Sequence, residues 1–228
     1  MNNDGRLAIV AGAGGELGRA TATTLADRGF TVVGIDRSEI ALKDLPDGIG
    51  REVADPTDPA VARGVVDAIA DRIGAPEVLV NTVGGFLVGD ALGTTHETWH
   101  LMLDVNLGPA LWLTQAAVPY MQQRGSGVIV HVAGRPGVEP SGGMAAYSVS
   151  KAALVHLTRV LDVELRAQGI RVNAVVPQLL DTARNRREFP AEVMAHAVAP
   201  QAIADVIAFL VSEEAAPVSG AIVPAYGN

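Results

Sequence analysis

The sequence of 228 residues predicts an α/β fold in which a parallel sheet carries helices on both faces. Two observations predict it: short apolar runs have the length of buried strands, and helical patterns stand between them. Strands that alternate with helices in this way form a parallel, doubly wound sheet. The expected strands are residues 7–11, 31–35, 77–81, 128–132, 170–176 and 221–223. The expected helices are residues 19–28, 60–73, two stretches within 96–121, one from 145 onward, and 201–212.

The sequence contains no internal repeat, low-complexity segment or linker, so a single domain over residues 1–228 is expected. Asp58 is expected to cap the helix that follows it. The two helical stretches within 96–121 are expected to meet near residues 106–109. Pro177 begins an irregular segment that runs to about Pro200, and its length and place suggest a substrate lid. Its arginines, Arg184, Arg186 and Arg187, hint at an anionic substrate.

Composition limits the classes of function. Hydrophobic residues make up 49% of the chain and charged residues 18%, so a large buried core is expected. The net charge of −8 argues against nucleic acid or an anionic membrane as the main partner. The chain has no cysteine, which excludes disulfides, thiolate metal sites and cysteine nucleophiles, and no metal site is expected. With no apolar run near about 18 residues, a soluble cytoplasmic protein is expected.

A glycine-rich turn follows the first expected strand and precedes the first helix. It comprises Gly12, Gly14, Gly15, Glu16, Leu17 and Gly18. Glycines let a backbone approach a pyrophosphate closely, and a helix N-terminus presents free amides and a partial positive charge. The sequence therefore predicts a Rossmann-type dinucleotide site at this turn.

The second expected strand ends at Asp36, about 20 residues after the glycine turn. A carboxylate at this place suits the ribose hydroxyls of NAD and repels the additional phosphate of NADP. Arg37 follows it, and a guanidinium could still bind that phosphate. We therefore expect NAD(H), with NADP(H) left open.

The other strand ends point to the same edge of the sheet. In an open parallel sheet, ligands bind beyond the carboxyl ends of the strands. Asp55 stands at the end of a short extended run, Asn81 ends the strand 77–81, and Gly134 lies just after the strand 128–132. These residues, the glycine turn and Asp36 are therefore expected to face one crevice beside Tyr147.

Tyr147 and Lys151 are four residues apart in the helical stretch that begins near Ala145. This spacing places both side chains on one face of a helix. A free tyrosine titrates near pH 10, and a cation within about 4–6 Å lowers that pKa. The pair is therefore a candidate for proton transfer, and we expect Lys151 to lower the pKa of Tyr147.

These residues together resemble the short-chain dehydrogenase/reductase family over nearly the whole chain. The resemblance rests on the glycine turn, on Asn81 to Gly84, on Asn106, on Tyr147 with Lys151, and on Arg171-Val172-Asn173 running to Pro177.

The resemblance implies a role for each matching residue. Tyr147 would exchange a proton with the substrate, Lys151 would lower its pKa and hold the nicotinamide ribose, and Asn106 would support a water relay. Asp55 would contact the adenine, and Thr182 the carboxamide. The further residues that the resemblance implies around the cofactor are Asn81, Val83, Gly84, Pro177 and Leu180. The resemblance also implies a homodimer or homotetramer, built on a four-helix interface of residues 96–121 and 147–166.

Three positions depart from the family pattern. The catalytic serine of the family usually stands about thirteen residues before the tyrosine, and that position is Gly134. Glu16 stands where the usual turn has glycine, and Gln178 replaces the glycine after Pro177. Losing one hydroxyl donor can cost on the order of 10²–10³ in rate where the chemistry needs it.

One branch of the family, the quinonoid dihydropteridine reductases, lacks that serine. Its glycine turn is similar to the one here, and its Gly-Gly-aromatic turn is similar to Gly84-Gly85-Phe86. Its Leu-Asp-Thr-x-x-Asn-Arg stretch is similar to residues 180–186. The chain is therefore expected nearest to this branch, with Phe86, Gly134 and Arg135 as candidate substrate contacts.

Two classes of function remain open from the sequence. The first is an NAD(P)H-dependent oxidoreductase that acts on a quinonoid, imine-like or carbonyl substrate. A quinonoid or imine-like acceptor is already electron-poor, so a proton from Tyr147 would suffice without a serine. The alternative is a divergent, non-redox nucleotide-binding protein of the same fold, which Gly134 and Glu16 favour.

Overall fold

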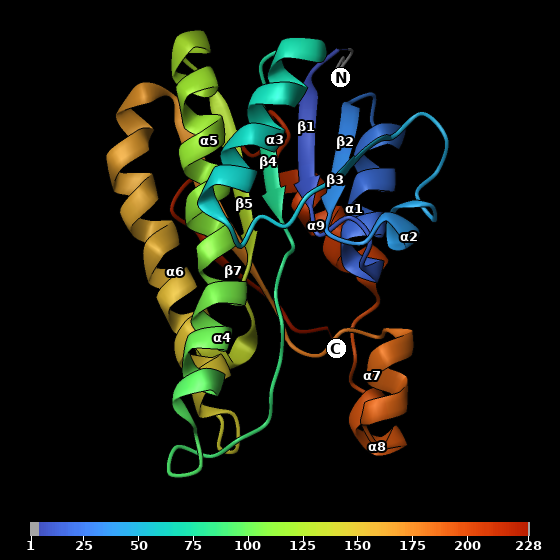
Figure 1. Cartoon of the computed structure of the whole chain (residues 1–228), viewed down its shortest axis with the longest axis vertical. Coiled ribbons are helices and arrows are strands. Elements are labelled where there is room, and N and C mark those ends of the chain that lie inside the picture. Colours follow the sequence, from blue (N-terminus) through green and yellow to red (C-terminus); the bar gives the residue numbers. More distant parts are fainter. Residues whose placement is uncertain (1–4, 228) are drawn as a thin grey trace.

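In the computed structural model, which describes residues 5–227, seven strands form one parallel sheet in the order β3-β2-β1-β4-β5-β6-β7 (Figure 1). The strands are β1 (Leu7–Ala11), β2 (Thr31–Asp36), β3 (Gly50–Val53), β4 (Val78–Asn81), β5 (Gly127–Val132), β6 (Ile170–Pro177) and β7 (Ile222–Ala225). Every neighbouring pair is parallel, from β1 with β2 to β6 with β7. The predicted fold class is confirmed, and the order reverses direction beside β1, where β4 pairs with it.

The strands bury side chains on both faces, because successive residues of a strand point to opposite sides. On one face, Ala8 and Val10 pack with α1 (Glu16–Asp27), α9 (Pro200–Leu210) and Leu42 of the short helix α2 (Glu39–Leu42). On the other face, Leu7 and Ile9 pack with three longer helices. These helices are α3 (Pro59–Arg72), α5 (Gly108–Arg124) and α6 (Ala145–Leu165).

Local sequence signals place the helix ends near the expected positions. The Asp58 carboxylate caps α3 by accepting from the amides of Ala60 and Val61, at 2.8 and 3.0 Å. The helical stretch within 96–121 breaks as expected, into α4 (His96–Asn106) and α5, whose first turn holds Pro109. Proline is tolerated there because the amide it lacks would have no partner in a first helical turn.

The segment 177–200 differs from the expectation of an irregular chain. It contains two short helices, α7 (Ala183–Glu188) and α8 (Ala191–Met194). The Thr182 hydroxyl caps α7 by accepting from the Asn185 amide at 3.1 Å, and Asp181 accepts both donors of Arg186. Figure 1 shows α7 and α8 beyond the carboxyl ends of the strands, separated from the sheet itself.

The Arg171-Val172-Asn173 stretch of β6 has a structural role at the opposite end of the sheet. The Arg171 guanidinium donates to the carbonyls of Leu210, Ser212 and Val218, so it neutralises the carbonyl end of α9. The Asn173 side chain donates to the Val218 carbonyl and accepts from the Ala221 amide, at 3.1 and 3.0 Å. Together these bonds join the chain before β7 to β6.

Within residues 5–227, we find no helix whose length and apolar character would let it span a bilayer.

Candidate active site

A cavity of about 820 Å³ opens at the carboxyl ends of β1, β4, β5 and β6. Its walls come from the glycine turn, the chain after β4, the loop after β5, the first turns of α6 and the segment 177–200. Fifteen of the site residues predicted from the sequence line it: Gly12, Gly14, Gly15, Glu16, Leu17, Gly18, Gly84, Phe86, Gly134, Arg135, Tyr147, Lys151, Pro177, Leu180 and Thr182. The structure therefore brings residues separated by up to 170 positions to one cavity, as the topology predicts.

Six predicted residues lie outside the lining of this cavity: Asp36, Arg37, Asp55, Asn81, Val83 and Asn106. Two of them, Asp36 and Asp55, hold loops after β2 and β3. Asp36 accepts from the amides of Gly14 and Ser38, at 3.0 and 2.9 Å. Asp55 accepts from the Thr57 amide and hydroxyl, and the Thr57 hydroxyl is the main cause that lowers the pKa of Asp55. Of the residues expected to face one crevice beside Tyr147, the glycine turn and Gly134 line it, whereas Asp36, Asp55 and Asn81 do not.

Asn81 and Asn106 are both buried in the protein interior. The Asn81 side chain accepts from the Val83 amide at 3.1 Å, which turns the chain as it leaves β4. Asn106 accepts from the Gly85 amide and donates to the Gly85 carbonyl, each at 3.0 Å. It also donates to the Ser150 hydroxyl of α6 at 3.1 Å, so it joins the chain after β4 to the helix that carries Tyr147.

Tyr147 and Lys151 point from one face of α6 into the cavity, as their spacing predicts. Lys151 is buried, and its ammonium donates to the Val132 carbonyl at 3.0 Å. The ammonium lies 6.0 Å from the centre of the Tyr147 ring.

The pKa values of this pair differ from the expectation. Burial raises the pKa of Tyr147 to about 12, and burial lowers the pKa of Lys151 to about 8. The expected lowering of the tyrosine pKa by Lys151 is therefore wrong for this structure. The reason is burial, because a phenolate in the protein interior loses the water that would stabilise its charge.

Gly134 stands directly beneath the Tyr147 hydroxyl. A Cβ atom built at Gly134 would lie 2.7 Å from the tyrosine oxygen and 3.6 Å from Cζ. The backbone of Gly134 is extended, with φ −178° and ψ 148°, so its conformation alone does not demand glycine. A side chain at this position would instead require the phenol hydroxyl of Tyr147 to shift.

Aromatic rings form one side of the cavity. Phe86 makes an edge-to-face contact with Tyr147, with ring centres 4.9 Å apart and planes at 84°. Phe189, at the end of α7, lies 6.2 Å from Phe86. The segment 177–200 thus reaches the catalytic tyrosine candidate through Phe86.

Arg135 lines the cavity but faces partners of its own. It forms an ion pair with Glu139 at 2.7 Å, donates to the Gln178 side chain at 2.9 Å, and lies 4.8 Å from the Tyr226 ring centre. These contacts hold the guanidinium at the rim of the cavity, on the side of Gln178.

The glycine turn fits an anionic ligand. Gly12 has φ +80°, and a Cβ atom there would lie 2.6 Å from the Thr82 hydroxyl oxygen, so only glycine fits this turn. Gly15 caps α1 without a side-chain hydrogen bond, which leaves the amides of the first turn facing the cavity. Free amides at the N-terminus of a 12-residue helix are a suitable site for a dinucleotide pyrophosphate. Among the described residues, no cluster of three or more His, Asp or Glu could hold a metal ion.

Glu16 joins the glycine turn to α7. Its carboxylate accepts from the Ala183 amide, the first residue of α7, at 2.7 Å. The two residues are 167 positions apart, so no local pattern in the sequence indicates this contact.

Several cavity residues were missed by the sequence analysis. Thr82 donates to the Ala11 carbonyl at 2.8 Å, and so holds the end of β4 against the glycine turn. Phe189, Met144, Leu179 and Glu188 also line the cavity. Strand-end position could have indicated Thr82, whereas the others lie in loops or short helices that have no periodic signal.

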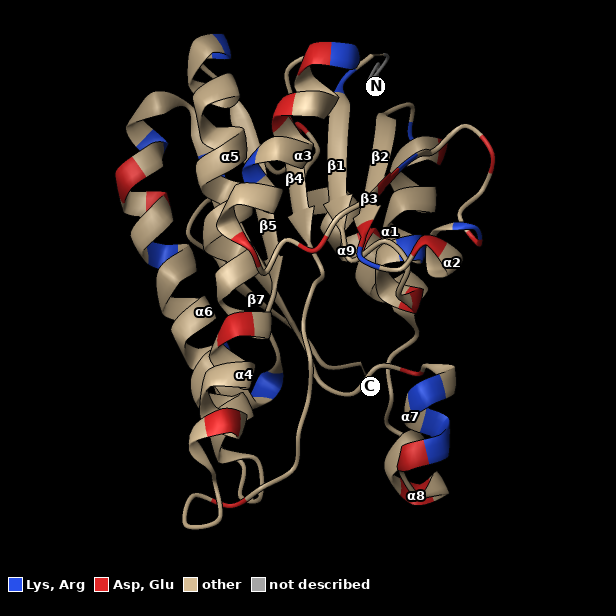
Figure 2. Cartoon of the chain, viewed as in Figure 1, with Lys and Arg blue, Asp and Glu red and all other residues tan. Residues whose placement is uncertain are grey.

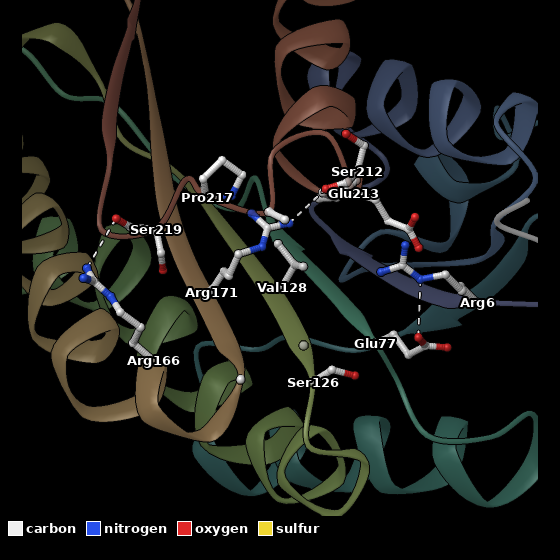
Figure 3. A pocket seen from close by; sticks show the side chains of 14 residues that line it. Arg6, Glu77, Ser126, Val128, Arg166, Arg171, Ser212, Glu213, Pro217 and Ser219 are labelled. Carbon is white, nitrogen blue, oxygen red and sulfur yellow. Dashed lines mark hydrogen bonds and ion pairs between the residues drawn. The ribbon is translucent and has the colours of Figure 1, made fainter. Parts of the chain in front are cut away.

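A second cavity of about 620 Å³ lies at the amino ends of β1, β5 and β6 (Figure 3). Arg6, Arg166 and Arg171 line it. Arg171 is held by the carbonyl end of α9, Arg6 pairs with Glu77 at 3.3 Å, and Arg166 pairs with Asp162. These arginines are held by groups of the fold, at the end of the sheet remote from Tyr147.

The comparisons with known proteins agree with this geometry. The sequence model described as short chain dehydrogenase matches residues 6–193. The 3-oxoacyl-(acyl-carrier-protein) reductase FabG of Escherichia coli is 32% identical, over 96% of this chain and 95% of the relative. The meso-2,3-butanediol dehydrogenase of Serratia marcescens is 28% identical, over 100% of this chain and 96% of the relative.

Solved structures give the same result. A short-chain dehydrogenase/reductase structure from Burkholderia xenovorans superposes with a TM-score of 0.94 at 29% identity, over 99% of this chain and 96% of the other. The structure of NAD+-bound xylitol dehydrogenase superposes with a TM-score of 0.93 at 25% identity, over the full length of both chains. The named relatives are FabG-type reductases and sugar or alcohol dehydrogenases, not dihydropteridine reductases, so the expected branch is not supported.

Proposed function

The chain belongs to the short-chain dehydrogenase family, an enzyme family whose members oxidise or reduce small molecules with NAD(P), and we propose that this member uses NAD(H) with Tyr147 as its proton donor and acceptor. The proposed acceptor is a quinonoid, imine-like or carbonyl group.

The observation that supports the proposal most is the position of the Tyr147 hydroxyl. It lies in the same cavity as the glycine turn, directly over Gly134 and beside Lys151. Since burial raises the tyrosine pKa to about 12, the phenol is protonated at neutral pH and suited to donate to a reduced acceptor.

The cofactor assignment rests on the glycine turn and on Asp36. When bound, the nicotinamide ring supplies or accepts the hydride. The open first-turn amides of α1, at residues 16–18, would hold the pyrophosphate, and Lys151 the nicotinamide ribose. Asp36 lies against Gly14, so its carboxylate favours ribose hydroxyls over a ribose phosphate. Arg37 is exposed beside it, which keeps NADP(H) as the second choice.

The remaining cofactor contacts are proposed from where each residue lies relative to the cavity. Four residues line the cavity and would contact the nicotinamide half of the cofactor: Gly84, Pro177, Leu180 and Thr182. Asn81, Val83 and Asp55 would act from outside the lining, by shaping the loops after β4 and β3. Asn106 would position Lys151 through α6, and a water relay behind it remains a proposal.

The glycine at position 134 affects which chemical class of acceptor the site favours. In the family pattern a serine hydroxyl stands here, and in this chain the tyrosine oxygen fills that volume. Because position 134 has no serine hydroxyl to polarise the acceptor, an electron-poor quinonoid or imine-like group is favoured. The names of the FabG and butanediol dehydrogenase relatives favour an ordinary carbonyl or alcohol instead. Both lie within the proposed reaction class.

The test is oxidation of NADH and of NADPH with a panel of quinones, imines and ketones. Tyr147→Phe should lower kcat by about 10²-fold or more, while NADH affinity stays within about threefold. Tyr120→Phe is the matched control, since Tyr120 lies on α5 and donates to Asp67 at 2.8 Å. NADH binding without turnover of any acceptor would favour the alternative, a non-redox nucleotide-binding protein.

We also propose that the protein is cytoplasmic and acts as a homodimer or homotetramer through α4, α5 and α6. Exposed apolar side chains on α4 and α6 support it: Trp99, Leu101, Val149, Val160 and Val163. Light scattering of the purified protein would give the mass that tests it.

A further inference from the structure

We infer that the acceptor substrate carries an uncharged, flat aromatic ring next to its reactive group. The inference rests on the proposed function, because it describes the substrate that Tyr147 would serve.

The first argument is the aromatic wall, defined here as the rings of Tyr147, Phe86 and Phe189. The acceptor atom must lie within about 2.6–3.2 Å of the Tyr147 hydroxyl to take its proton. Phe86 lies edge-to-face with that same ring at 4.9 Å, and Phe189 extends the wall from Phe86. A substituent on the acceptor carbon therefore meets aromatic rings at once.

The second argument is that the wall faces open space. Phe86 and Phe189 are only half-buried, and both line the cavity. Their centres are 6.2 Å apart and their planes are tilted by 48°, which leaves no room for a ring between them. A substrate ring would pack against the wall from the cavity side, in the offset or edge-to-face arrangements that aromatic pairs prefer.

The third argument is charge. Three basic side chains line the cavity, Arg135, Arg184 and Lys151, and three acidic ones, Glu16, Glu139 and Glu188. Arg135 pairs with Glu139 at 2.7 Å, and Arg184 with Glu188 at 2.8 Å. Lys151 donates to the Val132 carbonyl and Glu16 accepts from the Ala183 amide, so each charge lining the cavity already has a partner.

The arginines of the segment 177–200 therefore do not support the anionic substrate at which the sequence hinted. Figure 2 shows basic residues along α7 and an acidic residue at its end, Glu188, which pairs with Arg184. Arg186 is held by Asp181, and neither Arg186 nor Arg187 lines the cavity. A charged substrate group would have to compete with these existing ion pairs for its own partner.

The experiment compares two ketones of similar size, acetophenone and cyclohexyl methyl ketone, with NADH as the reductant. Phe86→Leu and Phe189→Leu keep an apolar side chain but remove a ring. Each should lower the ratio of kcat/KM for the aromatic over the saturated ketone by about fivefold, the size of one aromatic contact. Because the ratio is compared between variants, the intrinsic reactivity of the two ketones cancels.

Two variants act as controls. Phe86→Tyr keeps the ring and should keep the ratio within about twofold of that of the original protein. Phe209→Leu removes an exposed phenylalanine of α9 outside the cavity and should leave the ratio unchanged. NADH affinity, measured by fluorescence titration, shows that each variant is folded.

A charged analogue completes the test. 4-Acetylbenzoate should be reduced at least tenfold less efficiently than acetophenone. If it is preferred, or if both leucine variants affect the two ketones equally, the inference is wrong while Tyr147-dependent turnover still stands. Failure of the proposed function is a different result, since no acceptor would then oxidise bound NADH.

Discussion

Gly134 and Tyr147 share one small volume at the end of β5, and this sharing fixes the position of the phenol hydroxyl. A Cβ atom at Gly134 would lie 2.7 Å from that oxygen, inside the closest approach of real Cβ contacts. The hydroxyl cannot retreat freely, because the Tyr147 ring is in edge contact with Phe86. A substitution at Gly134 must therefore move the reactive group.

We predict that Gly134→Ala lowers kcat by about tenfold to a hundredfold, since a displacement near 1 Å of a reacting group can cost that much. Gly134→Ser should do the same, although it restores the hydroxyl of the family pattern. Steady-state kinetics with NADH and the best acceptor measure both. Gly142→Ala, where a Cβ atom meets nothing within 4 Å, should be silent.

A gain in ketone reduction by Gly134→Ser would contradict this account of Gly134. It would mean that the serine and the tyrosine can occupy this corner together, and that the glycine only removes a donor.

At the scale of elements, the segment 177–200 is held at two places. The Glu16 carboxylate accepts from the Ala183 amide at 2.7 Å, and Phe189 lies against Phe86 at the other end of α7. The first contact joins the segment to the glycine turn, and the second joins it to the loop after β4. Its position therefore depends on both halves of the proposed site.

We predict that Glu16→Ala raises hydrogen exchange of the amides in residues 181–189 about fivefold and raises KM for the acceptor, because α7 loses its bond to the glycine turn. Glu16→Gln keeps an acceptor oxygen and should restore most of both. Glu192→Gln changes an exposed carboxylate of α8 and is the matched control. Equal exchange in all three variants would show that Glu16 does not hold the segment.

The elements also show what a sequence can and cannot predict. The central strands and long helices were predictable because each buries an apolar face. Two helix starts were also predictable, since Pro109 is tolerated in a first helical turn and Asp58 caps the first amides of α3. The short helices α7 and α8 bury no such face, so they leave no periodic signal. At the site, helical spacing predicted the Tyr147 and Lys151 pair, whereas the tyrosine pKa depends on burial, which spacing does not reveal.

At the scale of the whole molecule, the core between the sheet and α5 contains a histidine. His131 is fully buried in β5, and within residues 5–227 neither ring nitrogen has a hydrogen-bond partner. Burial and then the charge of Lys151 lower its pKa from 6.5 to about 4. The folded protein therefore keeps this imidazole neutral at pH values where the unfolded chain would protonate it.

This difference predicts the pH dependence of stability. Between pH 6.5 and 4 the unfolded chain binds more protons at His131, so the free energy of unfolding falls as the pH falls, by about 3 kcal/mol from this group. His131→Leu removes the titrating group. Between pH 7 and pH 4, the free energy of unfolding of this variant should therefore fall by about 3 kcal/mol less than that of the original protein. Urea unfolding at several pH values measures the free energy of unfolding of both proteins, and shared effects such as the protonation of Asp55 cancel in the difference.

His156→Gln, on the exposed face of α6, is the control, and its unfolding free energy should follow that of the original protein. Parallel pH curves for His131→Leu and the original protein would mean that the folded core accepts the proton.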